Sequence, residues 1–235
     1  MTMKRPTLTA AMLLTALAAA PRPADTGELA FEAHAGYLGM AASNSASAVF
    51  DSTGAPTFGG AARLTFWRGA FVSIGGRTYS KEGERVFVLT PSSPVQKLGF
   101  PLSMRTTPLF VSGGYRLRRG ALVVPYVSAG LAIARYSESS EVTGETFDEV
   151  FTKTGFLGSV GVEVGRGTFR VGGEVGYTTV PNAIGLGGVS KVYGEDDIGG
   201  WHAVGKLIVS FDGTPSAPAK KPAPKPGPPV AKPKP

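Results

Sequence analysis

The stretch that decides the fold is residues 154–178, which read TGFLGSVGVEVGRGTFRVGGEVGYT. Two segments alternate between apolar residues and small or polar residues, and Gly165-Arg166-Gly167 separates them. Apolar residues at every second position indicate β-strands, because successive side chains of a strand point to opposite faces. Glycine supplies the positive φ that a tight turn requires. This stretch therefore predicts an antiparallel β-hairpin.

The same alternation recurs along the chain and predicts eight strands. They cover residues 29–38, 58–67, 71–80, 107–117, 122–136, 154–164, 168–178 and 201–211. Tight turns are expected at Arg68-Gly69, Arg118-Arg119-Gly120 and Gly165-Arg166-Gly167. The other connections, 39–57, 81–106, 137–153 and 179–200, are long and polar. Short turns at one end and long loops at the other are typical of a transmembrane barrel with an even number of strands.

The two faces of the strands differ in composition. In strand 107–117, Leu109 and Val111 share one face, whereas Ser112 and Arg116 share the other. Small residues with a few opposed charges suit the crowded interior of an eight-stranded barrel, so the apolar face is expected to meet lipid. Aromatic residues near both strand ends predict two interfacial belts. Tyr37, Phe58, Phe156, Tyr177 and Trp201 lie towards the long loops, and Phe66, Tyr115, Phe169 and Phe211 lie towards the short turns. A soluble barrel with an aromatic core is the alternative.

Eight charged residues fall on the inward face. They are Glu32, Arg63, Arg77, Arg116, Glu163, Arg170, Glu174 and Lys206. Because an unpaired ion is costly in a dry interior, we expect these residues to pair across strands and to plug the lumen. A narrow or gated porin-like channel remains an alternative function.

Strand 71–80 has an irregular pattern. Phe71 and Tyr79 share a phase with Arg77, while Val72 and Ile74 take the other phase. The conflict predicts a β-bulge or a shifted start in this strand.

Three motifs link the chain to a known family. They are Pro125-Tyr126-Val127-Ser128-Ala129-Gly130, Glu174 within the stretch 172–177, and the strand 205–211 that ends in Phe211. With these motifs the chain resembles the small outer-membrane β-barrel family that includes the transmembrane domain of outer-membrane protein A and outer-membrane protein X.

The resemblance implies an outer-membrane barrel domain over residues 28–212, in contact with membrane lipid and lipopolysaccharide. It also implies that the barrel-assembly machinery reads Gly205, Leu207, Val209 and Phe211. Two features depart from the family pattern. The terminal aromatic residue is followed by 24 further residues, and a globular peptidoglycan-binding domain is not expected after the barrel.

The two ends of the sequence have their own signatures. Lys4 and Arg5 precede an apolar stretch from Leu8 to Ala20, which predicts a signal peptide over residues 1–18 with cleavage near Ala18. Residues 214–235 hold nine prolines and five lysines, which predicts a disordered periplasmic tail. We expect the tail lysines to tether the barrel to peptidoglycan by charge. They are Lys220, Lys221, Lys225, Lys232 and Lys234.

Charge and composition exclude several functions. The net charge of +7 comes from the two ends, because residues 6–213 hold 17 basic and 17 acidic residues. A nucleic-acid-binding surface is therefore not expected. The absence of cysteine rules out disulfide and thiolate chemistry.

Catalysis and metal binding have little support in the sequence. The only histidines, His34 and His202, lack the His-x-Ser spacing of the lipid A deacylases, so an acyl-hydrolase barrel is the weaker alternative. The acidic residues of the long loops show no ordered ligand spacing, so neither a metal nor a cofactor is expected. Gly185-Leu186-Gly187-Gly188 is not expected to precede a helix, so a phosphate cradle is not predicted there.

Overall fold

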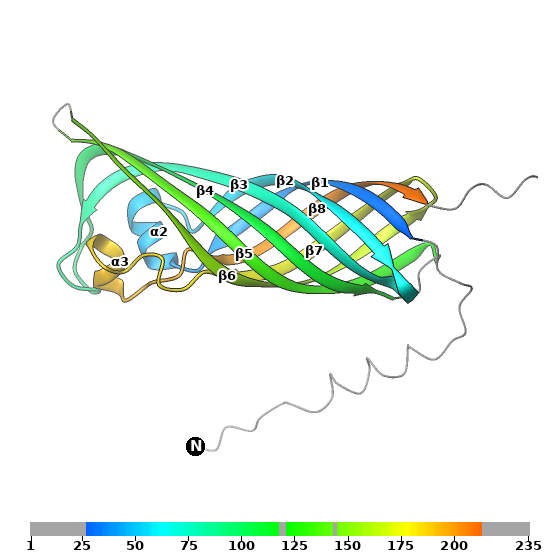
Figure 1. Ribbon diagram of the computed structural model, residues 1–235. Helices are drawn as coiled ribbons and strands as arrows, with labels where there is room; N and C mark the ends of the chain where they lie inside the picture. The colour runs from blue at the N-terminus through cyan, green and yellow to red at the C-terminus, as the bar shows by residue number, and fades with distance from the viewer. Residues whose placement is uncertain (1–26, 118–120, 143–144, 213–235) are drawn as a thin grey trace, which may run out of the picture.

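Eight antiparallel strands form a closed barrel in the computed structural model (Figure 1), which describes residues 27–117, 121–142 and 145–212. The strands are β1 Glu28–Met40, β2 Gly54–Phe66, β3 Ala70–Phe87, β4 Gln96–Arg116, β5 Val123–Val142, β6 Glu145–Arg166, β7 Phe169–Thr179 and β8 Gly200–Asp212. They pair in chain order, and β1 pairs with β8 to close the ring. This confirms the predicted eight-stranded antiparallel barrel. The predicted signal peptide and the tail lie outside the described residues.

The short turns lie together at one end of the barrel. Between β2 and β3 the chain forms a short 3-10 turn, η1 (Trp67–Gly69), in which Arg68 and Gly69 have φ of 55° and 97°. A side chain at Gly69 would collide with the main chain, since its Cβ would lie 2.5 Å from the carbonyl oxygen of Arg116. Between β6 and β7 the turn is made by Gly167 and Thr168, with φ of 70° at Gly167. The predicted turn at 118–120 lies outside the described residues.

The outer surface of the barrel is apolar. Large outward side chains such as Leu109, Val160 and Leu207 are more than half exposed. Such a surface is expected of a barrel that faces lipid rather than water. The expected aromatic residues lie on this surface near both ends. The Tyr37 and Trp201 rings are 6.2 Å apart near the long connections. Among the described residues, no helix is both long enough and apolar enough to cross a bilayer.

The expected irregularity in residues 71–80 is absent, and that prediction is wrong. The register of β3 against β4 is the same from Ala70–Tyr115 to Glu84–Pro101, although Arg77 and Thr78 are not among the paired residues, and it shifts only after Glu84. Phe71 and Tyr79 are buried inside the barrel on the same face as Arg77. The sequence pattern misled because bulky aromatic rings fill part of the lumen, where small and charged residues were expected.

Four strands are far longer than a membrane crossing requires, which corrects the predicted long loops at 81–106 and 137–153. β3, β4, β5 and β6 contain 18, 21, 20 and 22 residues, while about 9–11 residues suffice to span a bilayer. The outward face of these extensions is mostly polar in sequence, so the apolar outward positions that identify a membrane strand are lost there. We call the extensions, residues 79–87, 96–106, 135–142 and 145–155, the projecting sheet.

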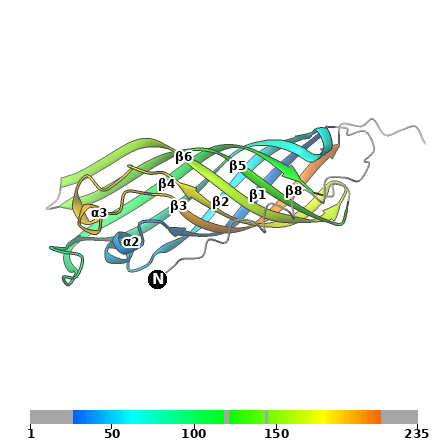
Figure 2. The ribbon, with the colours of Figure 1, turned by 90° about the horizontal axis from the view of Figure 1, so that it is seen from below.

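The other two long connections each contain a short helix, and Figures 1 and 2 show both helices at the end opposite the short turns. They are α2 (Ser43–Phe50) and α3 (Gly188–Tyr193). The expectation that no helix follows Gly185–Gly188 is therefore wrong, although α3 has only six residues. Glu195 joins the two connections, because its carboxylate accepts the backbone N–H groups of Asn44 and Ser45 at 2.9 and 2.8 Å.

Candidate functional site: the charged lumen

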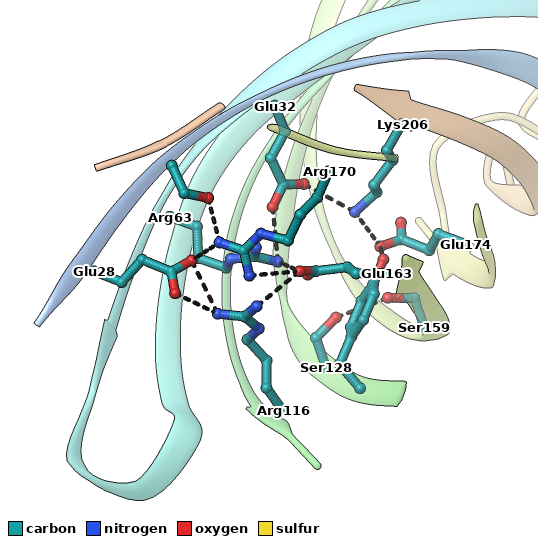
Figure 3. Close-up of polar contacts among 12 residues, drawn as sticks. Glu28, Glu32, Arg63, Arg116, Ser128, Ser159, Glu163, Arg170, Glu174 and Lys206 are labelled. Atoms are coloured by element: carbon teal, nitrogen blue, oxygen red, sulfur yellow. Dashed lines mark hydrogen bonds and ion pairs between the residues drawn. The ribbon is translucent and has the colours of Figure 1, made fainter. Parts of the chain in front are cut away.

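The structure places all eight predicted charged residues inside the barrel, where their side chains are at most 9 % exposed. Strand alternation positions them: each residue occupies an inward position flanked by lipid-facing neighbours. Figure 3 shows most of them converging on one another from different strands. With Glu28 they form one continuous set of contacts, which we call the ion-pair network.

Glu163 is the centre of the network towards the short turns. Its carboxylate pairs with Arg63 at 2.5 Å, with Arg116 at 2.9 Å and with Arg170 at 3.3 Å. Glu28 completes this region of the network, since it pairs with Arg116 at 3.0 Å and also with Arg170. Three guanidinium groups thus surround one fully buried carboxylate.

Glu32 connects the residues around Glu163 to Lys206, which lies nearer the middle of the barrel. Its two carboxylate oxygens pair with Arg63 at 2.8 Å and with Lys206 at 3.0 Å. Lys206 in turn pairs with Glu174 at 2.6 Å. Glu174 also accepts a hydrogen bond from the Tyr126 hydroxyl at 2.8 Å and lies 3.3 Å from His202 Nε2. The lysine therefore bridges two carboxylates near the middle of the barrel.

Arg77 lies at the opposite end of the network from Glu28. One guanidinium nitrogen, Nη2, is 3.7 Å from Glu174, and the guanidinium carbon lies 5.3 Å from the centre of the Phe110 ring. Positive and negative side chains thus alternate along the barrel. The series runs from Arg77 through Glu174, Lys206, Glu32, Arg63 and Glu163 to Arg116 and Arg170, and it ends at Glu28.

Sequence reasoning missed Glu28 and the contact between His202 and Glu174. Glu28 lies four residues before Glu32 in the same strand, so strand periodicity alone places both on the inward face. It was overlooked because the expected strand began at residue 29. His202 is also buried in the lumen, and its contact with Glu174 is not foreseen by the sequence pattern.

A cluster of mainly apolar side chains closes the barrel towards the long connections. This apolar cap consists of Leu38, Met40, Ala46, Ala55, Tyr79, Met104, Ala134, Tyr136, Val180, Ala183 and Ile198. The Tyr79 hydroxyl donates a 3.0 Å hydrogen bond to the carbonyl of Ile198, which fixes the returning chain over the lumen. Burial, together with the Glu138 carboxylate that Tyr136 contacts, raises the pKa of Tyr136 above its usual range. The ion-pair network towards the short turns and the apolar cap towards the long connections both obstruct the lumen.

The geometry indicates that the buried charges stabilise the barrel by pairing with one another. An isolated buried charge is expensive, and loss of one partner from a buried pair costs about 3–5 kcal/mol. Each carboxylate of the network meets at least two cations, so their mutual pairing offsets the cost of desolvation. Such a network specifies which strands face each other and favours one register.

Among the described residues, neither histidine forms a hydrogen bond with a serine hydroxyl. His202 contacts Glu174, and neither ring nitrogen of His34 has a hydrogen-bond partner in the described portion of the chain. No group of three or more His, Cys, Asp or Glu residues with metal-binding geometry occurs within residues 27–117, 121–142 and 145–212.

The residues assigned to barrel assembly lie on the outer face of β8. Gly205, Leu207 and Phe211 are exposed to the exterior, and Val209 is partly exposed. The Phe211 ring packs edge-on against Phe31 of β1 at 6.2 Å, at the seam where the first and last strands close the barrel. The five tail lysines lie outside the described residues.

A closed eight-stranded sheet, an apolar exterior and a lumen filled by side chains define a small β-barrel of the outer-membrane type. Two solved structures share this fold at low sequence identity. The outer membrane protein OprG from Pseudomonas aeruginosa superposes with a TM-score of 0.54 at 10 % identity, over 80 % of this chain and 98 % of that one. A major outer membrane protein from Thermus thermophilus gives 0.52 at 12 % identity, over 80 % and 100 %. No protein-family model matches the chain, and no curated protein matches its sequence.

Proposed function

We propose that the protein is a structural and interaction barrel of the bacterial outer membrane, without a catalytic role. The fold, which it shares with bacterial outer-membrane proteins, and its apolar exterior support this location. The ion-pair network and the apolar cap support a closed lumen, so function is assigned to the regions that extend beyond the membrane. A permanently open pore would require displacement of both obstructions.

The observation that carries the interaction role is the open edge of β6. β7 pairs with β6 only from Phe156 onwards, whereas β5 pairs with it up to Glu145. Residues 145–155 are therefore paired on one side only by the described strands. The opposite edge of the projecting sheet differs, because α2 packs against β3 there. A free strand edge is a template that an extended segment of another protein can extend by main-chain hydrogen bonds.

Charge indicates the kind of segment that would fit this edge. This edge carries three acidic residues, Glu145, Asp148 and Glu149, and one basic residue, Lys153. The edge thus favours an extended segment with basic side chains, because like charges on adjacent strands are unfavourable. This partner would approach from outside the cell, where the long connections of such barrels lie.

The proposal is tested with a soluble eight-residue peptide of alternating lysine and valine, whose binding to the detergent-solubilised barrel is measured by fluorescence anisotropy. An acidic peptide of alternating glutamate and valine is the control for charge, and a lysine peptide interrupted by prolines is the control for strand pairing. We expect only the basic strand-forming peptide to bind. In the double variant E145K/D148K the preference should reverse towards the acidic peptide. Equal binding of the proline-interrupted peptide, or an unchanged preference in the variant, would contradict pairing at this edge.

The basic tail supplies a second proposed contact, on the other side of the membrane. We infer that its five lysines hold the barrel loosely to peptidoglycan, which carries free carboxylates. The composition of residues 214–235 is what supports this role. Individually weak exposed ion pairs can act together when several lie on one stiff, extended segment.

A further inference from the structure

The charges of the ion-pair network do not balance. It contains five cations, Arg63, Arg77, Arg116, Arg170 and Lys206, and four carboxylates, Glu28, Glu32, Glu163 and Glu174. The series of contacts begins with a cation, Arg77, at one end and has two cations, Arg116 and Arg170, beside the single carboxylate Glu28 at the other. A surplus positive charge inside a low-dielectric lumen is unfavourable unless a counter-charge accompanies it.

The surplus charge lies at Arg77. Its only carboxylate contact among the described residues is the long 3.7 Å approach to Glu174, which already neutralises Lys206 at 2.6 Å. Arg77 Nη1 is buried and has no hydrogen-bond acceptor in the described regions of the chain. By contrast, Arg63, Arg116 and Arg170 each pair with two carboxylates.

A small interior cavity lies beside this arginine. Its volume is about 20 Å³, and Arg77, His34, Ser73, Phe110 and Ser112 are among the side chains that line it. His34 is buried, and both of its ring nitrogens lack hydrogen-bond partners among the described residues. Even a neutral imidazole carries one N–H donor. Two buried side chains with unused donors therefore line the same small space.

We propose that this cavity binds one chloride ion, held by the guanidinium of Arg77 and an N–H of His34. The surplus positive charge determines the sign of the ligand. The cavity determines its size, since about 10–15 Å³ accommodates a water molecule and chloride is only slightly larger. Phosphate, sulfate and carboxylates are excluded by volume. Glu32 and Glu174 also line the cavity, where Lys206 neutralises both, so the ion is assigned to the Arg77 nitrogen that has no acceptor, Nη1.

The test measures urea unfolding of the full chain, refolded into lipid vesicles at one pH and one ionic strength, in sodium chloride, bromide, sulfate or gluconate. Chloride and bromide should stabilise the barrel relative to sulfate and gluconate. Once the site saturates, each tenfold rise in chloride should raise the folding equilibrium constant about tenfold. Equal stability in chloride and gluconate would overturn the proposal.

Two variants and one direct observation sharpen the test. Arg77→Gln leaves four cations and four carboxylates and should abolish the halide dependence, whereas Arg105→Gln, which removes an exposed arginine, should retain it. In crystals grown in bromide, an anomalous peak should lie in the cavity beside Arg77, and this readout does not depend on whether a variant folds. A cavity that contains only water, or a halide dependence unchanged in Arg77→Gln, would show that the lumen has no anion site.

Discussion

Glu174 illustrates how much a single residue contributes to the lumen. It contacts Lys206, Tyr126, His202 and Arg77, which come from three different strands. Its inward position could be predicted, because Glu174 shares its phase with Arg170, Gly172 and Gly176, while Val171, Val175 and Tyr177 take the other phase. Its partners could not be read from the sequence, since register between distant strands is not encoded locally. An inward cation such as Arg170 or Lys206 is expected beside Glu174: Lys206 pairs with it, whereas Arg170 pairs with Glu28 and Glu163.

Glu174→Leu should destabilise the barrel by about 3 kcal/mol, because Lys206 and Arg77 would lose their shared counter-charge in the lumen. The measurement is the free energy of unfolding in urea, taken in vesicles. Glu82→Leu is the matched control, since Glu82 is exposed on the projecting sheet and should change stability by less than about 0.5 kcal/mol. A Glu174→Leu variant as stable as the parent would show that the contacts of this carboxylate contribute nothing net.

Each long strand is divided into a membrane-spanning segment and a water-exposed segment. Within the bilayer, the outward face is apolar and the inward face is mostly small or charged, with Phe71 and Tyr126 as exceptions, so the alternation is visible in the sequence and all eight crossings could be predicted. In the projecting sheet the outward face is mostly polar and part of the inward face packs in the apolar cap, so Glu141, Glu145 and Asp148 do not continue the pattern of the membrane segment. This is why the extensions of β3 to β6 were expected to be loops.

A pair of identical substitutions in β6 tests this division. Val160 and Val150 point to the same face and have nearly equal exposed fractions, 52 % and 53 %. Val160→Arg should cost about 2–4 kcal/mol in vesicles, because it places a cation in the middle of the lipid-facing band. Val150→Arg should have little effect, because its side chain meets water. Similar losses for both variants would mean that the membrane boundary is misplaced.

The two ends of the barrel differ in structure. The described strand ends place the start of β1 and the end of β8 at the short-turn end, while the projecting sheet and both helices occupy the other end (Figure 1). Chain order and turn length made this arrangement predictable. The closure of the lumen by the apolar cap near the long connections could not be predicted. It depends on helices and loops whose conformation is set by tertiary contacts rather than by local sequence.

The proposed tether predicts salt-sensitive binding of the full chain to peptidoglycan. At about 3.1 Å per residue, the 22 residues from 214 to 235 could reach roughly 70 Å. Purified barrel should sediment with isolated sacculi at low salt and be released at several hundred millimolar salt, since exposed ion pairs are screened. A chain lacking residues 214–235 is the control and should remain in solution. Equal retention of both chains, or retention that ignores salt, would rule out an electrostatic tether.

We expect the chain to be embedded in the membrane as a barrel in which every strand pairs with its neighbours. The most direct test of this expectation is the gel mobility of the membrane fraction in sodium dodecyl sulfate, with and without boiling, after a wash in alkaline carbonate. A barrel whose strands are all paired resists the detergent until heated. We expect the protein to stay with the membranes and to change mobility on boiling. A protein that carbonate removes, and whose mobility boiling leaves unchanged, would contradict the account.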